Sequence, residues 1–297
     1  MIKKHCIFAE KSNIPVMEIG HGTGLGASSI LIGKAPLSDI EMISLAKSYL
    51  KNTKLSVHVI PGLATIERDI DPAINLGVDI FRIASHCTEA SMTKTHIEYL
   101  NGKGKTVYGA LMMCATCPLN ILVEEVKKMK SYGASAVIIM DSTGSFTPNR
   151  VEECFKELSK IGIKLGFHAH NNLGLAVANS LVAIQCGAEI IDATVHGFGA
   201  GAGNTPLEIM TAIQPSGDIN VLESIDELDY KAPVVKIINI LTAKHKLHSV
   251  FEKKILESVD KYKVPLIPLV EELGARKLVA GQEDLVRVIA AQMCEQS

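Results

Sequence analysis

Residues 136–171, AVIIMDSTGSFTPNRVEECFKELSKIGIKLGFHAHN, carry the clearest signal of the chain's architecture. A short apolar run at 136–144 precedes an amphipathic run at 148–161, and a second short run follows at 164–171. Short apolar runs predict buried strands, and Thr147 lies where the N-cap of a helix is expected. The stretch therefore predicts a β-α-β unit with two parallel strands.

The same unit repeats from the start of the chain almost to residue 213. Strands are expected at 15–22, 55–62, 78–86, 106–114, 136–144, 164–171 and 190–199. Helices are expected at 38–51, with Ser38 as N-cap, and at 64–76, 89–101, 118–132, 148–161, 173–185 and 206–213. This repetition predicts an α/β fold, a TIM (β/α)8-type barrel, and seven strands leave that barrel with a gap. An open doubly wound sheet, which tolerates seven strands, is the alternative.

The two ends of the chain differ from this repeat. Residues 1–12 read as a helix, so the absent barrel element is expected to be the first strand, which would precede them. Beyond the repeat the pattern is helical only, with runs expected at 229–247, 250–261, 265–273 and 283–292. We therefore expect an N-terminally incomplete barrel at 1–215 and a helical C-terminal domain at 216–297.

Composition narrows the class of function. The 297 residues carry a formal net charge of -2 and no block of like charges, which argues against nucleic acid and anionic membranes as partners. No apolar run is long enough to be expected to cross a membrane. An odd count of seven cysteines in a chain of this size predicts reduced thiols and a cytoplasmic setting. These features favour small-molecule chemistry.

The pair His168 and His170 is the sharpest chemical signal. Side chains two apart on a strand share a face, and at the carboxyl end of a barrel strand the inner face is the active site. Two imidazoles on one face suit Mn, Fe, Co or Zn, with a carboxylate as the usual third ligand. The alternative is a hydrogen-bonded pair that only fills the strand end.

Polar residues end other strands as well. Ser142 follows Asp141 where one apolar run stops, and either it binds substrate or the segment is a turn. Glu18 lies in an apolar strand, so it is a site residue or half of a buried ion pair. Arg82 and His86 either face the site or, for Arg82, pair with an acid such as Glu18.

Two further motifs carry weaker signals. The glycine-rich stretch 197–204, which ends in Asn204, lets the backbone approach a ligand or a neighbouring side chain, but it lacks the P-loop ending. The CxxC pair, Cys114 and Cys117, has no partner pair at zinc-site spacing, so buried or loop thiols are expected.

Several of these segments together resemble the 4-hydroxy-2-oxovalerate aldolases, a branch of the pyruvate-metal lyases that includes HMG-CoA lyase and isopropylmalate synthase. The resemblance runs along essentially the whole chain. Its strongest pieces are EIGHG at 18–22, RIASHCTEA at 82–90, MDS at 140–142, HAHNNL at 168–173, GAGAGNTPLE at 199–208 and GQED at 281–284.

The resemblance implies a metal-dependent lyase of aromatic hydrocarbon catabolism. It would cleave 4-hydroxy-2-oxopentanoate to pyruvate and acetaldehyde through a metal-stabilised pyruvate enolate. Mn2+ or another divalent metal would bind His168 and His170, and Ser142 and His168 would contact substrate. Glu18 and Asn204 are further candidates. An acylating acetaldehyde dehydrogenase is the implied partner.

The chain departs from the family pattern in two places. The family's first strand ends in Thr-Leu-Arg-Asp-Gly, and no such motif occurs here, so the catalytic Arg, the His after it and the Asp ligand would precede Met1. Relatives carry a substrate-contacting tyrosine in the region that reads LTAKHKLH at 241–248 here, and His248 is the candidate for that space.

These departures leave rival functions open. Glu18 or Asp141 could replace the absent carboxylate in an active lyase. The chain could instead be an inactive or fragmentary homologue that binds a partner, or a related acyl-CoA or 2-oxo acid lyase or synthase.

Overall fold

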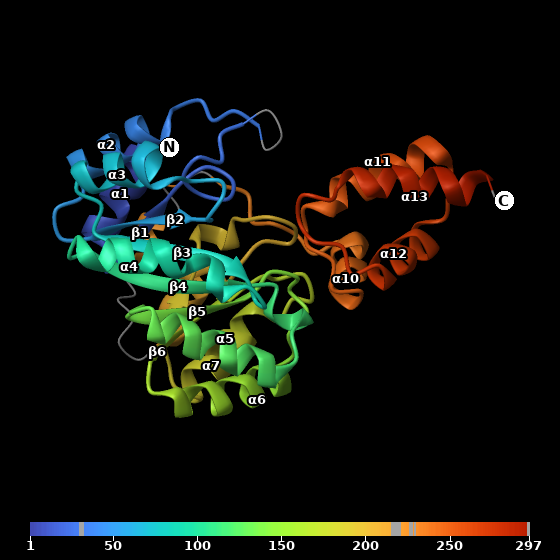
Figure 1. Cartoon of the computed structure of the whole chain (residues 1–297). Coiled ribbons are helices and arrows are strands. Elements are labelled where there is room, and N and C mark those ends of the chain that lie inside the picture. The colour runs from blue at the N-terminus through green and yellow to red at the C-terminus, as the bar shows by residue number, and fades with distance from the viewer. Residues whose placement is uncertain (30–32, 215–220, 226–227, 229, 296–297) are drawn as a thin grey trace.

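Seven parallel strands form one sheet in the order in which they occur along the chain (Figure 1). The structure is a computed structural model that describes residues 1–29, 33–214, 221–225, 228 and 230–295. The strands are β1 (Val16–Ile19), β2 (Lys54–Val59), β3 (Ile80–His86), β4 (Thr106–Met112), β5 (Ala136–Asp141), β6 (Lys164–Ala169) and β7 (Ala188–Asp192).

This strand order settles the choice between the two expected architectures. A doubly wound sheet reverses its strand order at a switch point, whereas these strands follow one another from edge to edge. Among the described residues β1 and β7 do not pair with each other. The predicted barrel-type fold with seven strands is therefore confirmed, and a strand lies at each expected place. The bounds differ most for the last strand, which was expected at 190–199 and runs from Ala188 to Asp192.

The connecting helices agree with the predicted pattern. They are α1 (Ile2–Lys11), α2 (Asp39–Tyr49), α3 (Asp71–Asn75), α4 (Lys94–Gly102), α5 (Leu119–Ser131), α6 (Pro148–Leu158), α7 (Ala176–Gln185) and α8 (Leu207–Ile213). Ser38 caps α2 in a capping box with Glu41, and the Thr147 hydroxyl accepts a hydrogen bond from the Arg150 backbone at the start of α6. Both predicted N-caps are confirmed.

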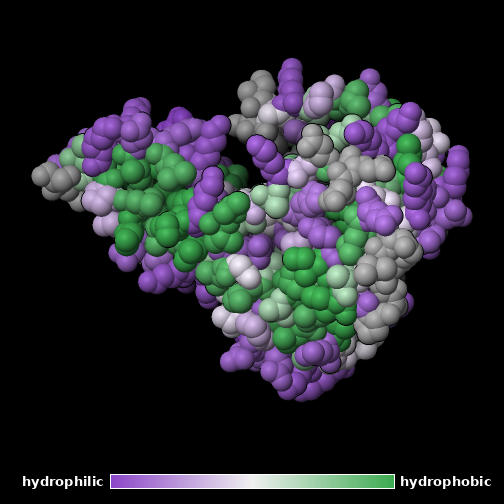
Figure 2. Space-filling model, turned by 180° about the vertical axis from the view of Figure 1, so that it is seen from behind, coloured by the Kyte–Doolittle hydropathy of each residue, from purple (hydrophilic) through white to green (hydrophobic). Residues whose placement is uncertain are grey.

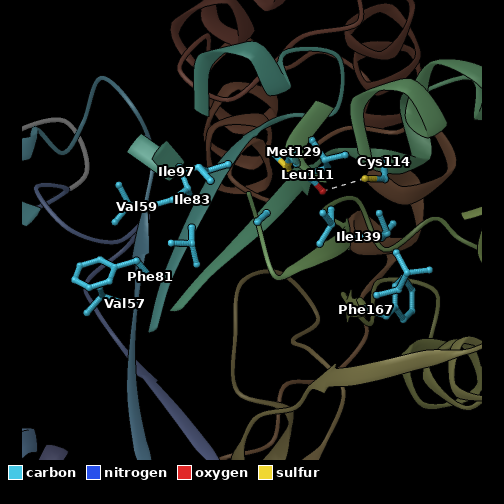
Figure 3. Packing of buried hydrophobic residues seen from close by; sticks show 14 of the residues in the cluster. Val57, Val59, Phe81, Ile83, Ile97, Leu111, Cys114, Met129, Ile139 and Phe167 are labelled. Carbon is cyan, nitrogen blue, oxygen red and sulfur yellow. Dashed lines mark hydrogen bonds between the residues drawn. The ribbon is translucent and has the colours of Figure 1, made fainter. Parts of the chain in front are cut away.

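The outer face of the sheet and the inner faces of the helices form the main core (Figure 3). Residues of this layer alternate along each strand, as in Val57 and Val59 of β2, which are fully buried. Phe167 of β6 stacks on Phe146 with ring centroids 6.1 Å apart and meets Phe155 edge-on at 5.5 Å. This packing fixes β6 and therefore the residues that follow it.

The other face of the strands points into the barrel. Its apolar part is small and is built on Ala84, Ala110 and Ile138. Because strand neighbours in register share a face, the same interior also receives charged and imidazole side chains from β1, β2, β3, β6 and β7. The barrel interior is thus only partly hydrophobic.

A helical unit follows the barrel and stands beside it (Figure 1). Its elements are α10 (Ile237–Lys244), α11 (Phe251–Tyr262), α12 (Leu266–Ala275) and α13 (Asp284–Glu295), whereas α9 (Val221–Ile225) packs against the barrel helices α1 and α8. The helices α10 to α13 share a core of their own that includes Leu247, Phe251, Leu269 and Val286. No helix of the described residues is long and apolar enough to cross a membrane.

One expectation for this unit is wrong. The run 229–247 was expected to be helical throughout, but 230–236 is not helical and α10 begins at Ile237. Pro233 lacks a backbone N–H and disfavours the helical conformation of the residue before it. Residue 229 and the expected domain boundary at 215 and 216 lie outside the described residues.

The side-chain amide of Asn172 joins the barrel to the helical unit. Asn172 lies in the loop after β6 and is fully buried. Its Nδ2 faces the Asn239 carbonyl at 3.5 Å, the Thr242 hydroxyl at 3.4 Å, the Ser249 hydroxyl at 3.3 Å and the Glu252 carboxylate at 3.2 Å. The Asn172 side chain therefore lies within hydrogen-bond distance of acceptors in α10, in α11 and in the turn between these helices.

We predict that Asn172→Ala lowers the free energy of unfolding by about 1 to 3 kcal/mol, because buried acceptors lose their donor. Urea unfolding would measure the loss, and limited proteolysis should cut 230–236 faster in the variant. The control is Asn101→Ala, since Asn101 is exposed and donates to Gly133 at the surface. Equal destabilisation by the two substitutions would contradict the proposed junction.

Candidate metal and substrate site

His168 and His170 lie together at the carboxyl end of β6. Their ring centroids are 5.2 Å apart and their planes meet at 62°. His170 is 9% exposed. Burial lowers the pKa of His170 well below its usual value, and the nearby His168 and His248 lower it further. His170 is therefore neutral at physiological pH, as a metal ligand must be.

The residues present fit a divalent metal in part. Two imidazoles at one strand end are a suitable donor pair, and His170 Nδ1 is buried without a hydrogen-bond partner. Within the described residues, however, no group of three His, Cys, Asp or Glu side chains is arranged to hold a metal ion. Neither Glu18 nor Asp141 forms such a group with the two histidines among those residues.

The side chain of Asp141 stabilises the loop that follows β5. Its fully buried carboxylate accepts hydrogen bonds from the backbone of Ser145 at 3.0 Å and of Phe146 at 2.9 Å, and from the Thr143 hydroxyl at 3.3 Å. The turn interpretation of this segment is thus correct for Asp141. Ser142 is 3% exposed, and its hydroxyl oxygen accepts the Met113 N–H at 3.0 Å.

Glu18 is half of an ion pair, but it is not buried. Its carboxylate lies 3.2 Å from Nε of Arg82 and accepts a hydrogen bond from Ser56 at 3.1 Å, while a third of the side chain, 33%, is exposed. The exposure arises because β1 is a sheet edge. Arg82 itself is buried, and the pairing of Arg82 with an acid is confirmed.

Asp192 is the site residue that sequence reasoning missed. It ends β7 and is the register partner of His168 on β6. Its Oδ2 lies 3.0 Å from Nδ1 of His168, and both of its oxygens accept hydrogen bonds from Arg82. The sequence signal is partial: Asp192 interrupts an apolar run at a strand end as Asp141 does, but nothing local identifies His168 and Arg82 as its partners.

The charges of this group stabilise one another. Burial disfavours the Asp192 carboxylate, but the Arg82 charge and the His168 hydrogen bond outweigh it and lower the pKa of Asp192. Burial likewise opposes the charge of Arg82, while Asp192 and Glu18 raise its pKa. His58 of β2 faces the same interior, and burial lowers its pKa.

The glycine-rich stretch packs tightly against neighbouring protein groups. A Cβ on Gly201 would lie 2.5 Å from the Ser249 hydroxyl, and one on Gly203 would lie 2.1 Å from the Gly197 carbonyl. The close approach expected of these glycines is therefore made to neighbouring protein groups. Asn204 pairs through its backbone with His170, and its Oδ1 is buried without a partner.

The remaining candidates divide into one near the site and several outside it. His248 of the helical unit lies with its ring 6.3 Å from that of His170, and burial lowers its pKa. His86 instead contacts the Thr88 hydroxyl at 2.9 Å. Cys114 and Cys117 are buried, and burial raises their pKa values, so they are poor nucleophiles. No disulfide joins the cysteines of the described residues.

The pKa of Asp141 makes stability depend on pH. Burial raises the pKa of Asp141 from 3.8 to about 6, although the hydrogen bonds from Phe146 and Ser145 lower it in part. The folded chain binds more protons than the unfolded chain between these values. We predict that stability falls by about 3 kcal/mol from this group as pH rises through that window.

Urea unfolding of the unmodified chain and of Asp141→Asn at several pH values tests this dependence. The amide cannot accept both backbone hydrogen bonds as the carboxylate does, so the variant should be less stable throughout. Its disadvantage should shrink between pH 4 and pH 6. A constant difference across that range would contradict the raised pKa.

Comparisons with known proteins show which family the chain belongs to. Residues 14–227 match the HMGL-like family model, and residues 246–295 match the DmpG-like communication domain. The chain is 43% identical to the 4-hydroxy-2-oxovalerate aldolase of Spirochaeta aurantia, over 98% of this chain and 89% of that one. It is 41% identical to the enzyme of that name from Pectobacterium atrosepticum, over 99% and 89%.

Solved structures support the fold alone. The N-terminal domain of a putative aldolase from Bacteroides vulgatus has a TM-score of 0.72 at 23% identity and covers 86% of this chain and 89% of that one. The carboxyl transferase domain of Rhizobium etli pyruvate carboxylase has a TM-score of 0.79 at 15% identity, over 99% and 57%. The sequence relatives carry the assignment: the chain belongs to the HMGL-like family, among the 4-hydroxy-2-oxovalerate aldolases.

Proposed function

We propose that the chain is a divalent-metal-dependent aldolase that cleaves 4-hydroxy-2-oxopentanoate to pyruvate and acetaldehyde. The observation that carries the proposal is the imidazole pair at the end of β6, in a chain 43% identical to a relative named for this substrate. The barrel at 1–215 would hold the site, and the helical part at 216–297 would cover it.

In this proposal His168 and His170 hold Mn2+ or another divalent metal. When bound, the cation polarises the 2-keto oxygen and stabilises the negative charge that develops there. The neutral state of His170 and the hydrogen bond from His168 to Asp192 support these two residues as ligands. Arg82 is committed to two carboxylates and takes no part in binding substrate.

The reaction needs few bond changes. The 4-hydroxyl loses its proton and the bond between C3 and C4 breaks, which releases acetaldehyde. The electron pair of that bond passes to the 2-oxo acid fragment, and protonation at C3 gives pyruvate. The chain's own task is to bind and orient the 2-oxo acid while this charge develops.

Two polar groups, Ser142 and Asn204, would orient the substrate, and His248 would shield the site. Ser142 accepts the Met113 N–H, so its own proton is available to a substrate oxygen. Asn204 keeps a buried oxygen without a partner beside the backbone of His170. His248 approaches His170 from the helical unit and, in place of the relatives' tyrosine, would limit the access of water to the site. We assign no contact with substrate to Glu18.

We further propose that the helical unit binds an acylating acetaldehyde dehydrogenase, which would consume the aldehyde product. Residues 246–295 match a communication domain. Figure 2 shows hydrophobic surface gathered over this unit. Exposed apolar side chains there are Ile237, Ile240, Val250, Leu256, Ile267, Val279, Leu285 and Val288. A cytoplasmic setting, which suits the unbridged thiols, is part of the same proposal.

We predict Mn2+-dependent release of pyruvate from 4-hydroxy-2-oxopentanoate, measured by coupling to lactate dehydrogenase. The double variant His168→Ala/His170→Ala should lose at least about 100-fold in rate, since a Lewis acid contributes several kcal/mol. His5→Ala is the matched control, because His5 lies on α1 and contacts Tyr230.

Two outcomes would count against the proposal. Release that persists unchanged in the double variant would reject these two metal ligands. Failure of the unmodified chain to release pyruvate with Mn2+ or any other divalent metal would reject the reaction itself.

A further inference from the structure

We propose that Asp192 is the positioning residue of the metal site: it fixes the tautomer and the ring orientation of His168. The inference rests on the proposed function in one respect, that His168 is a metal ligand. The hydrogen bond that it concerns lies within the chain itself.

The geometry gives His168 one defined hydrogen-bond partner. Asp192 Oδ2 lies 3.0 Å from Nδ1 of His168, and the two residues are register partners on adjacent strands. An ionised carboxylate only accepts hydrogen bonds, so Nδ1 must carry the proton. A neutral imidazole then keeps its lone pair on Nε2, the nitrogen that remains to bind a cation.

Arg82 holds Asp192 in this role. Nη1 and Nη2 of Arg82 both donate to the carboxylate, the second at 3.0 Å to Oδ1, so the carboxyl plane is set from β3. Oδ2 is shared between Nη1 of Arg82 and Nδ1 of His168. Outer-shell carboxylates of this kind orient a ligating histidine and raise its basicity.

Glu18 provides a matched comparison within the same group of charges. It contacts Arg82 from the other side at 3.2 Å and accepts a hydrogen bond from Ser56, but among the described residues no hydrogen bond or ion pair joins it to His168. Removing the charge of Glu18 therefore perturbs Arg82 and leaves the bond between Asp192 and His168 in place. Removing the charge of Asp192 perturbs Arg82 and also changes the hydrogen bond between Asp192 and His168.

The first test reads the tautomer of His168 in the metal-free chain labelled with 15N-histidine. Two-bond proton–nitrogen correlations distinguish the two neutral forms, and the signal lost in His168→Gln identifies the residue. We expect the form protonated at Nδ1 in the unmodified chain and in Glu18→Gln. In Asp192→Asn, whose amide can donate, the form protonated at Nε2 should appear.

The second test is the affinity for Mn2+, measured by titration calorimetry. Asp192→Asn should bind about 10- to 100-fold more weakly, and Glu18→Gln should bind as the unmodified chain does. A folded Asp192→Asn with unchanged affinity and unchanged tautomer would overturn the proposal. So would an unmodified chain whose His168 is protonated at Nε2, even if the variant does not fold.

These results separate the two proposals. If His168→Gln binds Mn2+ normally, His168 is not a metal ligand, and the tautomer of His168 in the unmodified chain does not change that conclusion. If His168→Gln loses Mn2+ but Asp192→Asn does not, the metal assignment stands and the role of Asp192 fails.

Discussion

The ion pair between Arg82 and Asp192 is the interaction on which the interior of this barrel depends. It joins β3 to β7 across the inside of the sheet, and Glu18 extends it to β1. A buried guanidinium is costly unless its partners are well placed, so this pair constrains the relative positions of the three strands. The same carboxylate also fixes His168, so the element that organises the fold organises the candidate site.

The other constraint comes from outside the barrel. Asn172 and Gly201, both in loops at the carboxyl ends of strands, pack directly against the helical unit. His248 enters the site from the turn between α10 and α11. A change in the position of the helical unit would therefore reach the loop that follows His170 without any change in the barrel strands. The candidate metal site and the helical unit therefore belong to one connected structure.

The sequence predicted most of the elements because each strand and helix carries its own periodicity. His168 and His170 were accessible for the same reason, since their spacing alone places them on one face. Asp192 was not, because its role depends on the register between β6 and β7 and on Arg82, 110 residues away. The turn at Asp141 and the exposed edge at Glu18 likewise depend on neighbours that no local pattern reveals.

A crystal of the chain soaked in Mn2+ and measured at an anomalous wavelength would locate the metal. We predict an anomalous peak within coordination distance of Nε2 of His168 and of a ring nitrogen of His170. Nδ1 of His168 should stay on Asp192, and Arg82 should keep both contacts with that carboxylate. A well-occupied peak elsewhere in the barrel, with none at the imidazole pair, would contradict this prediction.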